Sequence, residues 1–285
     1  MPSDVGELVD SHAHLDMEDF DRDRDRVVES ARESGITAVL CPAELTHPNS
    51  LTTLRELSRR QPGIALAAGV HPHQAKDFKP EHLDALRGLA ASGGICALGE
   101  IGLDFHYNFS SAEAQRRVFL SQALLARELG LPVIIHTRQA GEEAAGLLEE
   151  AGYEGRGVLH CYTETWELAR RMLDRGFFVS FTGILTFPKA EDVREVARRI
   201  PLDRLMVETD SPFLLPRRSP ERNRGTKAGL LELLAFPNEP KNLVLIAQTI
   251  AELKKTSFYP PSSRFRRARQ LIKVTTKNAR KLFQL

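Results

Sequence analysis

Metal-binding side chains recur along this sequence, each close to the end of an apolar run. His12 and His14 follow Leu8 and Val9 and stand two positions apart, a spacing that on a strand turns both imidazoles to one face. Imidazole is the commonest nitrogen ligand of metals in proteins and coordinates in its neutral form. The pair supplies half of a metal site, so further ligands must come from elsewhere in the chain.

Further side chains of this kind follow later apolar runs. They are His71, Glu100, His136, His160 and Asp210. Nitrogen and carboxylate ligands with open positions suit Zn, Mn or Mg, and a carboxylate at Glu100 could bridge two ions about 3.5–4 Å apart. Such a centre activates water and clamps the oxygens of a phosphoryl group, and Asp210 could bind an ion and also accept a proton from the attacking water. The alternative role of Asp210 is a helix N-cap.

The elements that must position these residues alternate between apolar runs and amphipathic stretches. We expect strands at 8–14, 36–40, 64–70, 95–98, 132–135, 157–159, 177–181 and 205–207, with helices between them that mostly end at glycine. Ser110 with Glu113 predicts a capping box for the helix that stops at Gly130. Eight such units, roughly 25–30 residues apart, predict a (β/α)8 TIM barrel, whose strand ends meet at one face.

The rest of the architecture follows from this pattern. Helices near 243–254 and 266–283 would complete the outer ring, and we expect one domain over residues 1–285. A doubly wound sheet is disfavoured because no Gly-x-Gly-x-x-Gly follows the first strand and because the ligands come from too many strands.

Composition limits the classes of protein that remain. With 285 residues, 42% hydrophobic and 27% charged, and no apolar run near the ~20 residues of a membrane span, the chain reads as a soluble protein without a membrane partner. Its first residues lack a secretory signal, so we expect the cytoplasm. Cys41, Cys96 and Cys161 form no C-x-x-C pair and read as small buried hydrophobes. A net charge of +1 argues against a broadly basic coat for nucleic acid.

Two segments depart from the even spacing. The segment 211–240 is long and contains four arginines, Arg217, Arg218, Arg222 and Arg224, which indicate either a solvated basic loop or a functional lid. The segment 258–263 reads as a linker, and the basic run 264–269 reads as a solvated helix face.

The motifs together resemble the TatD family of metal-dependent deoxyribonucleases, within the amidohydrolase-like barrels. They are Asp10-Ser11-His12-Ala13-His14-Leu15-Asp16, Gly69-Val70-His71-Pro72-His73, Leu98-Gly99-Glu100-Ile101-Gly102-Leu103-Asp104, Ile135-His136-Thr137-Arg138, Leu159-His160-Cys161-Tyr162, Glu208-Thr209-Asp210-Ser211-Pro212 and the tail Thr276-Lys277-Asn278-Ala279-Arg280-Lys281-Leu282-Phe283. The resemblance implies two ion sites that share Glu100, one formed with His12, His14 and Asp210 and the other with His136 and His160. It also implies that His71, Asp104 and Arg138 contact the substrate or support the ligands.

One motif departs from the family. Related sequences read Arg-Asn-Glu-Pro where this chain has Pro237-Asn238-Glu239-Pro240. A guanidinium that would contact phosphate or anchor the loop is therefore missing, and Arg222 or Arg224 would replace it as a substrate contact.

The resemblance implies a two-metal hydrolase that cuts DNA, as a 3'-5' exonuclease on single strands, with RNA as a further substrate. One alternative is an amidohydrolase or esterase on the same barrel, such as a D-aminoacyl-tRNA deacylase. Many amidohydrolases carry a modified lysine on the fourth strand, and the presence of Glu100 there favours the nuclease. The other alternative is a metal-binding scaffold without turnover, against which Asp210 argues as a proton acceptor.

Overall fold

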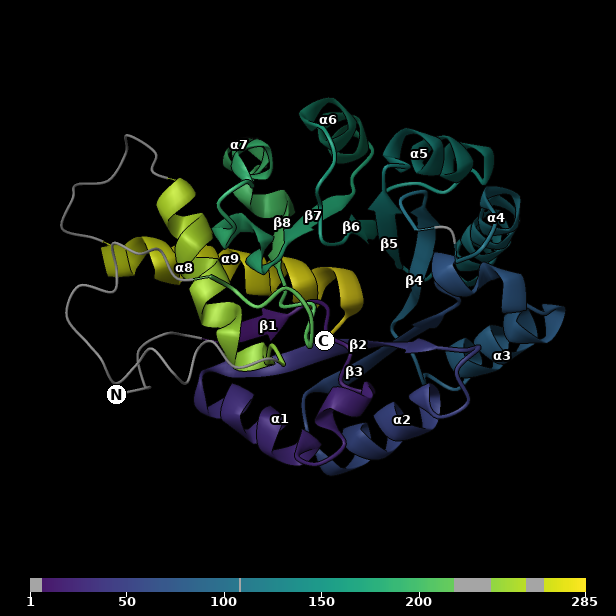
Figure 1. Cartoon of the computed structure of the whole chain (residues 1–285), viewed down its shortest axis with the longest axis horizontal. Helices are drawn as coiled ribbons and strands as arrows, with labels where there is room; N and C mark the ends of the chain where they lie inside the picture. Colours follow the sequence, from purple (N-terminus) through teal and green to yellow (C-terminus); the bar gives the residue numbers. More distant parts are fainter. Residues whose placement is uncertain (1–6, 108, 218–236, 255–263) are drawn as a thin grey trace.

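The computed structural model describes residues 7–107, 109–217, 237–254 and 264–285, and in this part of the chain eight parallel strands form one sheet in the order β1 to β8 (Figure 1). They are β1 (Leu8–Asp10), β2 (Ile36–Glu44), β3 (Ile64–Gly69), β4 (Ala97–Asp104), β5 (Val133–Arg138), β6 (Gly157–Leu159), β7 (Phe178–Phe181) and β8 (Leu205–Val207). The two ends of the sheet meet, because Ser11 N–H donates to the carbonyl of Val207 at 3.2 Å and Asp210 N–H donates to that of His12 at 3.0 Å. The predicted (β/α)8 barrel is confirmed, but β1 ends at Asp10, so His12 and His14 lie past its end and not on the strand as predicted.

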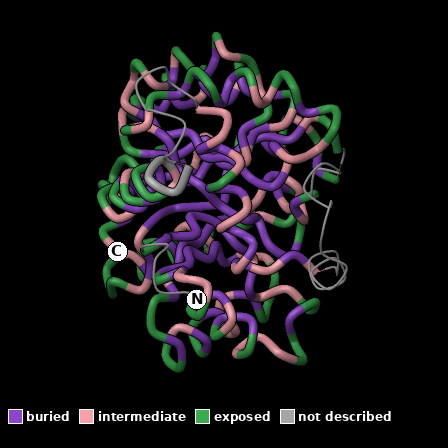
Figure 2. Tube along the Cα trace, turned by 90° about the vertical axis from the view of Figure 1, so that its left-hand side faces the viewer, coloured by how far each residue is buried: buried purple, intermediate pink, exposed green. Residues whose placement is uncertain are grey.

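The helices lie around the strands (Figure 1). They are α1 (Arg24–Glu33), α2 (Ser50–Arg60), α3 (Pro80–Ala91), α4 (Ala112–Leu129), α5 (Gly141–Glu150), α6 (Trp166–Asp174), α7 (Glu191–Arg199), α8 (Leu243–Leu253) and α9 (Arg264–Phe283). Figure 2 shows the buried strands inside and alternating burial along the helices outside. No helix in the described ranges has both the length and the apolar character needed to cross a membrane.

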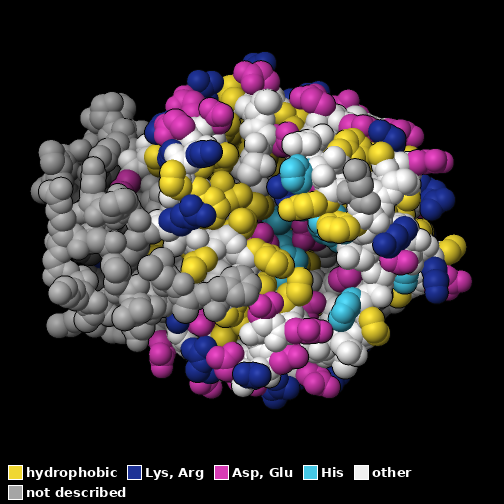
Figure 3. Space-filling view, in the orientation of Figure 1, with side chains coloured by type: hydrophobic (Ala, Val, Ile, Leu, Met, Phe, Trp, Pro, Cys, Tyr) yellow, Lys and Arg dark blue, Asp and Glu magenta, His cyan; other side chains and the backbone are white. Residues whose placement is uncertain are grey.

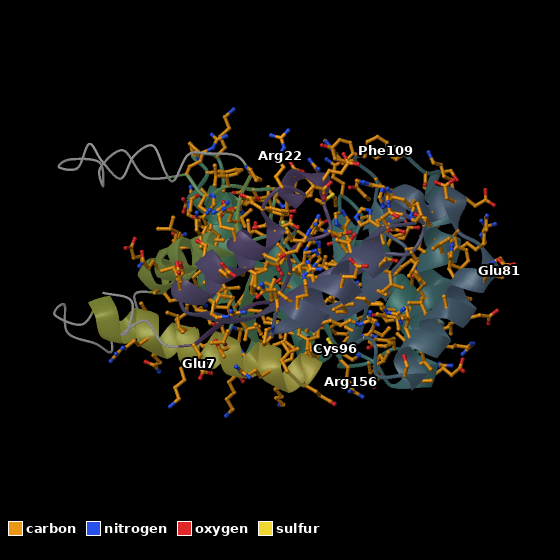
Figure 4. The ribbon with its side chains drawn as sticks, turned by 90° about the horizontal axis from the view of Figure 1, so that it is seen from below. Glu7, Arg22, Glu81, Cys96, Phe109 and Arg156 are labelled. Atoms are coloured by element: carbon orange, nitrogen blue, oxygen red, sulfur yellow. The ribbon has the colours of Figure 1, made fainter. Side chains whose placement is uncertain are left out.

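Only the end of helix α9 differs from the expectation that it completes the outer ring, because Leu271 and Ile272 belong to the same buried cluster as the side chains of α8. Its last residues Ala279, Leu282 and Phe283 pack in a cluster that takes buried side chains from all eight strands, among them Val9 and Met206. Figure 4 shows α9 (yellow) along the lower edge, on the side of Glu7, Cys96 and Arg156, which precede β1, β4 and β6. The end of α9 therefore closes the amino-terminal end of the barrel, because its apolar face finds there the inward side chains of the strands.

Strand β4 is longer than predicted. It continues past Glu100 to Asp104, and Gly102 pairs in register with His136 of β5. A Cβ atom on Gly102, which has φ 150°, would lie 1.9 Å from the carbonyl oxygen of His136. Only glycine lets the two strands come this close, and the strand therefore continues past the predicted end at residue 98.

The predicted capping box at α4 is wrong by one residue. The N-cap is Ser111, whose hydroxyl accepts the N–H of Ala114. Ser110 instead donates its hydroxyl to the carbonyl of His73 at 2.7 Å and so ties the loop after β4 to the turn η2 (Pro72–Asp77). The predicted end of α4 at Gly130 is confirmed, with φ 65°.

Candidate metal centre

Glu100 lies at the centre of the predicted ligands, at the carboxyl-terminal face of the barrel. Its Oε1 is 2.7 Å from Nδ1 of His136 and 2.7 Å from Nε2 of His160. Its Oε2 is 3.3 Å from Nε2 of His12 and 3.6 Å from Nε2 of His14. The two oxygens of one carboxylate thus face two different pairs of histidines.

Asp210 completes the group on the side of Oε2. Its Oδ1 lies 3.3 Å from Nε2 of His14 and 3.7 Å from Nε2 of His12, and these two nitrogens are 3.1 Å apart. Ligand atoms that share one ion at about 2.1 Å lie about 3.0–3.4 Å from each other in octahedral or tetrahedral geometry. The spacing and the mixture of imidazole and carboxylate donors fit a divalent cation.

The charges in this cluster are strongly coupled. Burial alone would raise the pKa of Glu100, but the facing histidines, His160 first, hold it well below its usual range. Burial opposes protonation of His160, yet Glu100 raises its pKa well above the usual value. Burial and the charge of His160 lower the pKa of His12. Protons on the histidines thus balance the buried carboxylates, and divalent cations would replace those protons.

Glu208 lies behind His160 and was not among the predicted site residues. It is fully buried, and its Oε1 is 3.3 Å from Nδ1 of His160 and accepts the N–H of Cys161 at 2.5 Å. Its Oε2 accepts the hydroxyl of Ser11 at 3.2 Å. A carboxylate on the far nitrogen of a ligating histidine fixes its tautomer and orientation. The available signal was the position of Glu208, directly after the apolar run of β8.

The structure places His71 and Asp104 beside the predicted ligands. His71 Nδ1 accepts the N–H of His73 at 3.2 Å, and burial lowers the pKa of His71 to about 4, so its Nε2 carries the proton 3.4 Å from Glu100 Oε1. Asp104 Oδ2 accepts from Nε2 of His73 at 2.8 Å and from Nε2 of His136 at 3.2 Å. Both side chains thus orient Glu100 and His136, and His73, which stands in a sequence motif without a predicted role, is a further member of the group.

An open cleft of about 720 Å³ leads to the cluster. Figure 3 shows histidine and acidic side chains at the floor of this hollow and hydrophobic side chains around its mouth. Arg138 lines the cleft, with its guanidinium carbon 4.7 Å from the centre of the Tyr107 ring. The predicted contacts Arg222 and Arg224, together with Arg218 and the segment 258–263, lie outside the described residues.

The motif at 237–240 keeps a structural role without its arginine. Asn238 is fully buried, and its amide donates to the carbonyls of Thr209 at 3.0 Å and Phe213 at 2.7 Å. The asparagine therefore holds the turn that carries Asp210.

A barrel of this kind with clustered histidines and carboxylates at its carboxyl-terminal face defines the class of metal-dependent hydrolases. Residues 9–284 match the family described as TatD related DNase, and the chain belongs to this family, as its motifs predict.

Relatives of known sequence and structure agree with this assignment. A protein of Bacillus subtilis named uncharacterized metal-dependent hydrolase YabD is 36% identical over 279 residues, which cover 98% of this chain and 99% of the relative. The 3'-5' ssDNA/RNA exonuclease TatD of Erwinia tasmaniensis is 37% identical over 287 residues, which cover 98% of this chain and 100% of the relative. The crystal structure of YjjV, a TatD homologue from Escherichia coli, shares the fold with a TM-score of 0.82 at 24% identity, over 98% of both chains.

Proposed function

We propose that this protein is a metal-dependent nuclease that hydrolyses phosphodiester bonds, as a 3'-5' exonuclease on single-stranded DNA with RNA as a further substrate. The observation that carries the proposal is Glu100, whose two oxygens face two separate sets of ligands. Two ions bridged in this way are typical of centres that displace a phosphoryl group. The substrate named for the Erwinia relative, single-stranded DNA and RNA, supports the same choice.

The proposal assigns two divalent ions, Mg, Mn or Zn. One would be held by His12, His14, Glu100 and Asp210, and the other by Glu100, His136 and His160. When bound, such ions lower the pKa of a coordinated water and neutralise charge on the phosphoryl oxygens.

The chain's own side chains supply the remaining steps. Asp210 would accept the proton of the attacking water at its carboxylate, whose pKa stays below the ordinary value because His14 and His12 outweigh the effect of burial. Arg138 would hold a phosphate oxygen pair through its guanidinium fork. His71 and Asp104 would act by orienting Glu100 and His136, which are the groups they contact.

Two wider assignments belong to this proposal. We propose one domain over residues 1–285, since β1 and β8 meet and α9 packs beneath all eight strands. We also propose the cytoplasm, because Cys41, Cys96 and Cys161 are all free, as in reducing compartments.

The test uses metal-free protein reloaded with Mg, Mn or Zn and mixed with single-stranded DNA, duplex DNA, RNA and D-aminoacyl-tRNA. Glu100→Gln keeps the side-chain volume, so it should stay folded, lose an ion by elemental analysis and lose about 10³-fold in turnover. Glu143→Gln, on the outer helix α5 and paired with Arg116, is the matched control and should keep its metal content and its turnover. Hydrolysis of the aminoacyl ester alone would favour a deacylase, and metal binding without any turnover would favour a scaffold.

A further inference from the structure

Exposed aromatic rings gather at the mouth of the cleft. Among the described residues, the exposed large hydrophobic side chains are Tyr107 (40%), Phe109 (55%), Phe213 (42%) and Leu124 (40%). Tyr107 and Phe213 line the cleft, and Phe109 stacks on Tyr107, whereas Leu124 lies on the outer helix α4. Grouped exposed apolar side chains, unlike single ones, mark a binding site.

The first aromatic surface stands on the loop after β4. The Tyr107 and Phe109 rings lie 5.4 Å apart between centres and 23° from parallel. The loop is held at both ends, because Asp104 Oδ1 accepts the N–H of Tyr107 at 2.9 Å and Ser110 donates to the carbonyl of His73 at 2.7 Å. These rings are therefore in place before a substrate arrives, which lowers the entropic cost of binding.

The second aromatic surface stands on the turn after β8. Phe213 N–H donates to the carbonyl of Asp210 at 2.9 Å, and its own carbonyl accepts from Asn238 at 2.7 Å. Its ring meets the ring of His14 edge to face, at 5.9 Å between centres. Phe213 is thus fixed to the same turn that carries the proposed ligand Asp210.

The proposed metal centre lies between these two surfaces. Phe109 meets the ring of His73 at 4.9 Å, and His73 shares Asp104 with His136. At the other edge of the centre, Phe213 meets His14. Figure 4 shows Phe109 on the upper edge of the molecule, the face opposite α9. A phosphate at the centre would therefore have an aromatic ring on each side.

The chemistry of this mouth fits a nucleic acid single strand. Base faces stack on aromatic rings without regard to sequence, and cations among the rings meet the phosphates. Arg138 supplies such a cation, since its guanidinium lies over the Tyr107 ring. Bases in a duplex already stack on their neighbours, so an unpaired end offers its faces more readily.

We propose that Phe109 and Phe213 are stacking surfaces for the unpaired bases on either side of the scissile phosphate, with Tyr107 supporting Phe109. This inference rests on the proposed nuclease function and adds the part of the substrate that is recognised, namely the faces of two bases rather than their edges. In this inference the rings of Phe109 and Phe213 determine the preference of the enzyme for single strands over duplex ends.

The test compares Phe109→Leu and Phe213→Leu, which keep an apolar side chain without a ring, in the metal-loaded enzyme. The substrates are an oligothymidylate and the same strand with abasic sites at its last two positions. On the intact strand each variant should raise KM about tenfold while kcat changes little, since stacking of one base is worth about this factor. On the abasic strand the variants should equal the wild type, which itself should bind that strand more weakly.

Three controls separate stacking from a structural effect. Phe109→Trp and Phe213→Trp retain a stacking face and should restore KM. Leu124→Ala, at the exposed side chain away from the cleft, should equal the wild type. Because stacking releases no counterions, the ratio of KM between each leucine variant and the wild type should stay constant as salt rises.

The outcomes distinguish this inference from the proposed function. A wild type that cuts no oligonucleotide with any metal overturns both. A wild type that cuts single strands, with leucine variants of unchanged KM, overturns the stacking alone. Equal losses on intact and abasic strands, or a reduced metal content in the variants, would mean that the rings only support the fold and would also overturn it.

Discussion

Glu208 stands behind the proposed ligands, and its replacement tests how far the metal centre depends on that support. The carboxylate contacts three groups, namely Nδ1 of His160 at 3.3 Å, the N–H of Cys161 at 2.5 Å and the hydroxyl of Ser11 at 3.2 Å. Glu208→Gln keeps the volume of this fully buried side chain. It removes the negative charge that faces Nδ1 of His160, while the new amide N–H can donate to the hydroxyl of Ser11, whose own proton has the carbonyl of Val207 as acceptor at 3.1 Å.

The size of the effect follows from these contacts. Losing the group that orients a ligating histidine typically weakens metal binding about 10–100-fold. Glu208 orients His160 and also anchors the backbone beside it, so we expect weakening near the upper figure for one ion. Titration calorimetry of metal-free protein with Mn measures the binding, and a metal titration of nuclease activity measures the consequence. At saturating metal kcat should return to within about threefold, because no group that touches substrate has changed.

Ser11→Ala is the matched control, because it removes one donor to Glu208 and leaves the carboxylate on His160. Its metal affinity should fall by less than about tenfold. The reasoning is refuted if folded Glu208→Gln protein binds both ions as the wild type does. A variant with normal metal content that stays inactive would instead assign Glu208 to the chemistry itself.

Three further predictions concern charge and backbone. Burial opposes the charge on His14, but the hydrogen bond and charge of Asp210 outweigh it and raise the pKa of His14 to about 9. In metal-free protein the stability gained from this pair is therefore complete below the unfolded pKa of 6.5 and is lost as pH rises through about 9. The difference in melting temperature between wild type and His14→Asn should shrink from about pH 6 to about pH 9.5, and a constant difference would contradict the prediction. Gly102→Ala puts Cβ against the carbonyl of His136. The free energy of unfolding, measured in urea, should therefore fall by about 4 kcal/mol or more. A stable variant with unchanged metal affinity would count against the close contact between β4 and β5. Arg138→Ala should reduce the slope of log KM against log salt by about 0.7 on single strands, and an unchanged slope would remove its phosphate contact.

The sequence predicts the barrel well because burial on both faces makes most of the parallel strands begin as continuous apolar runs, and glycine marks most helix ends. The ends of these runs carry His12, Glu100, His160 and Asp210, so one topological rule brings residues far apart in sequence to one face. Their convergence can therefore be predicted from the sequence, and their role as metal ligands is a further prediction.

The remaining features depend on distances across the barrel that no local pattern encodes. The predicted fourth strand stops at residue 98, because only the register with β5 shows why Gly102 must face His136. Glu208 is one acidic residue among many until β6 and β8 place it behind His160. Likewise the exposure of Phe109 and Phe213 follows from how their loops are tied, and an aromatic residue in a sequence is by default a core residue.

The contact between β1 and β8 has a consequence for the order in which the proposed metal centre can be assembled during synthesis. The turn that carries Asp210 is bonded to the backbone of His12, so this side of the proposed centre takes one ligand from just after the first strand and another from the turn after the last strand. A nascent chain that has not yet reached β8 carries histidines but lacks Asp210 and the carboxylate behind His160. The proposed metal centre therefore cannot be completed until β8 has joined β1 and the barrel has closed.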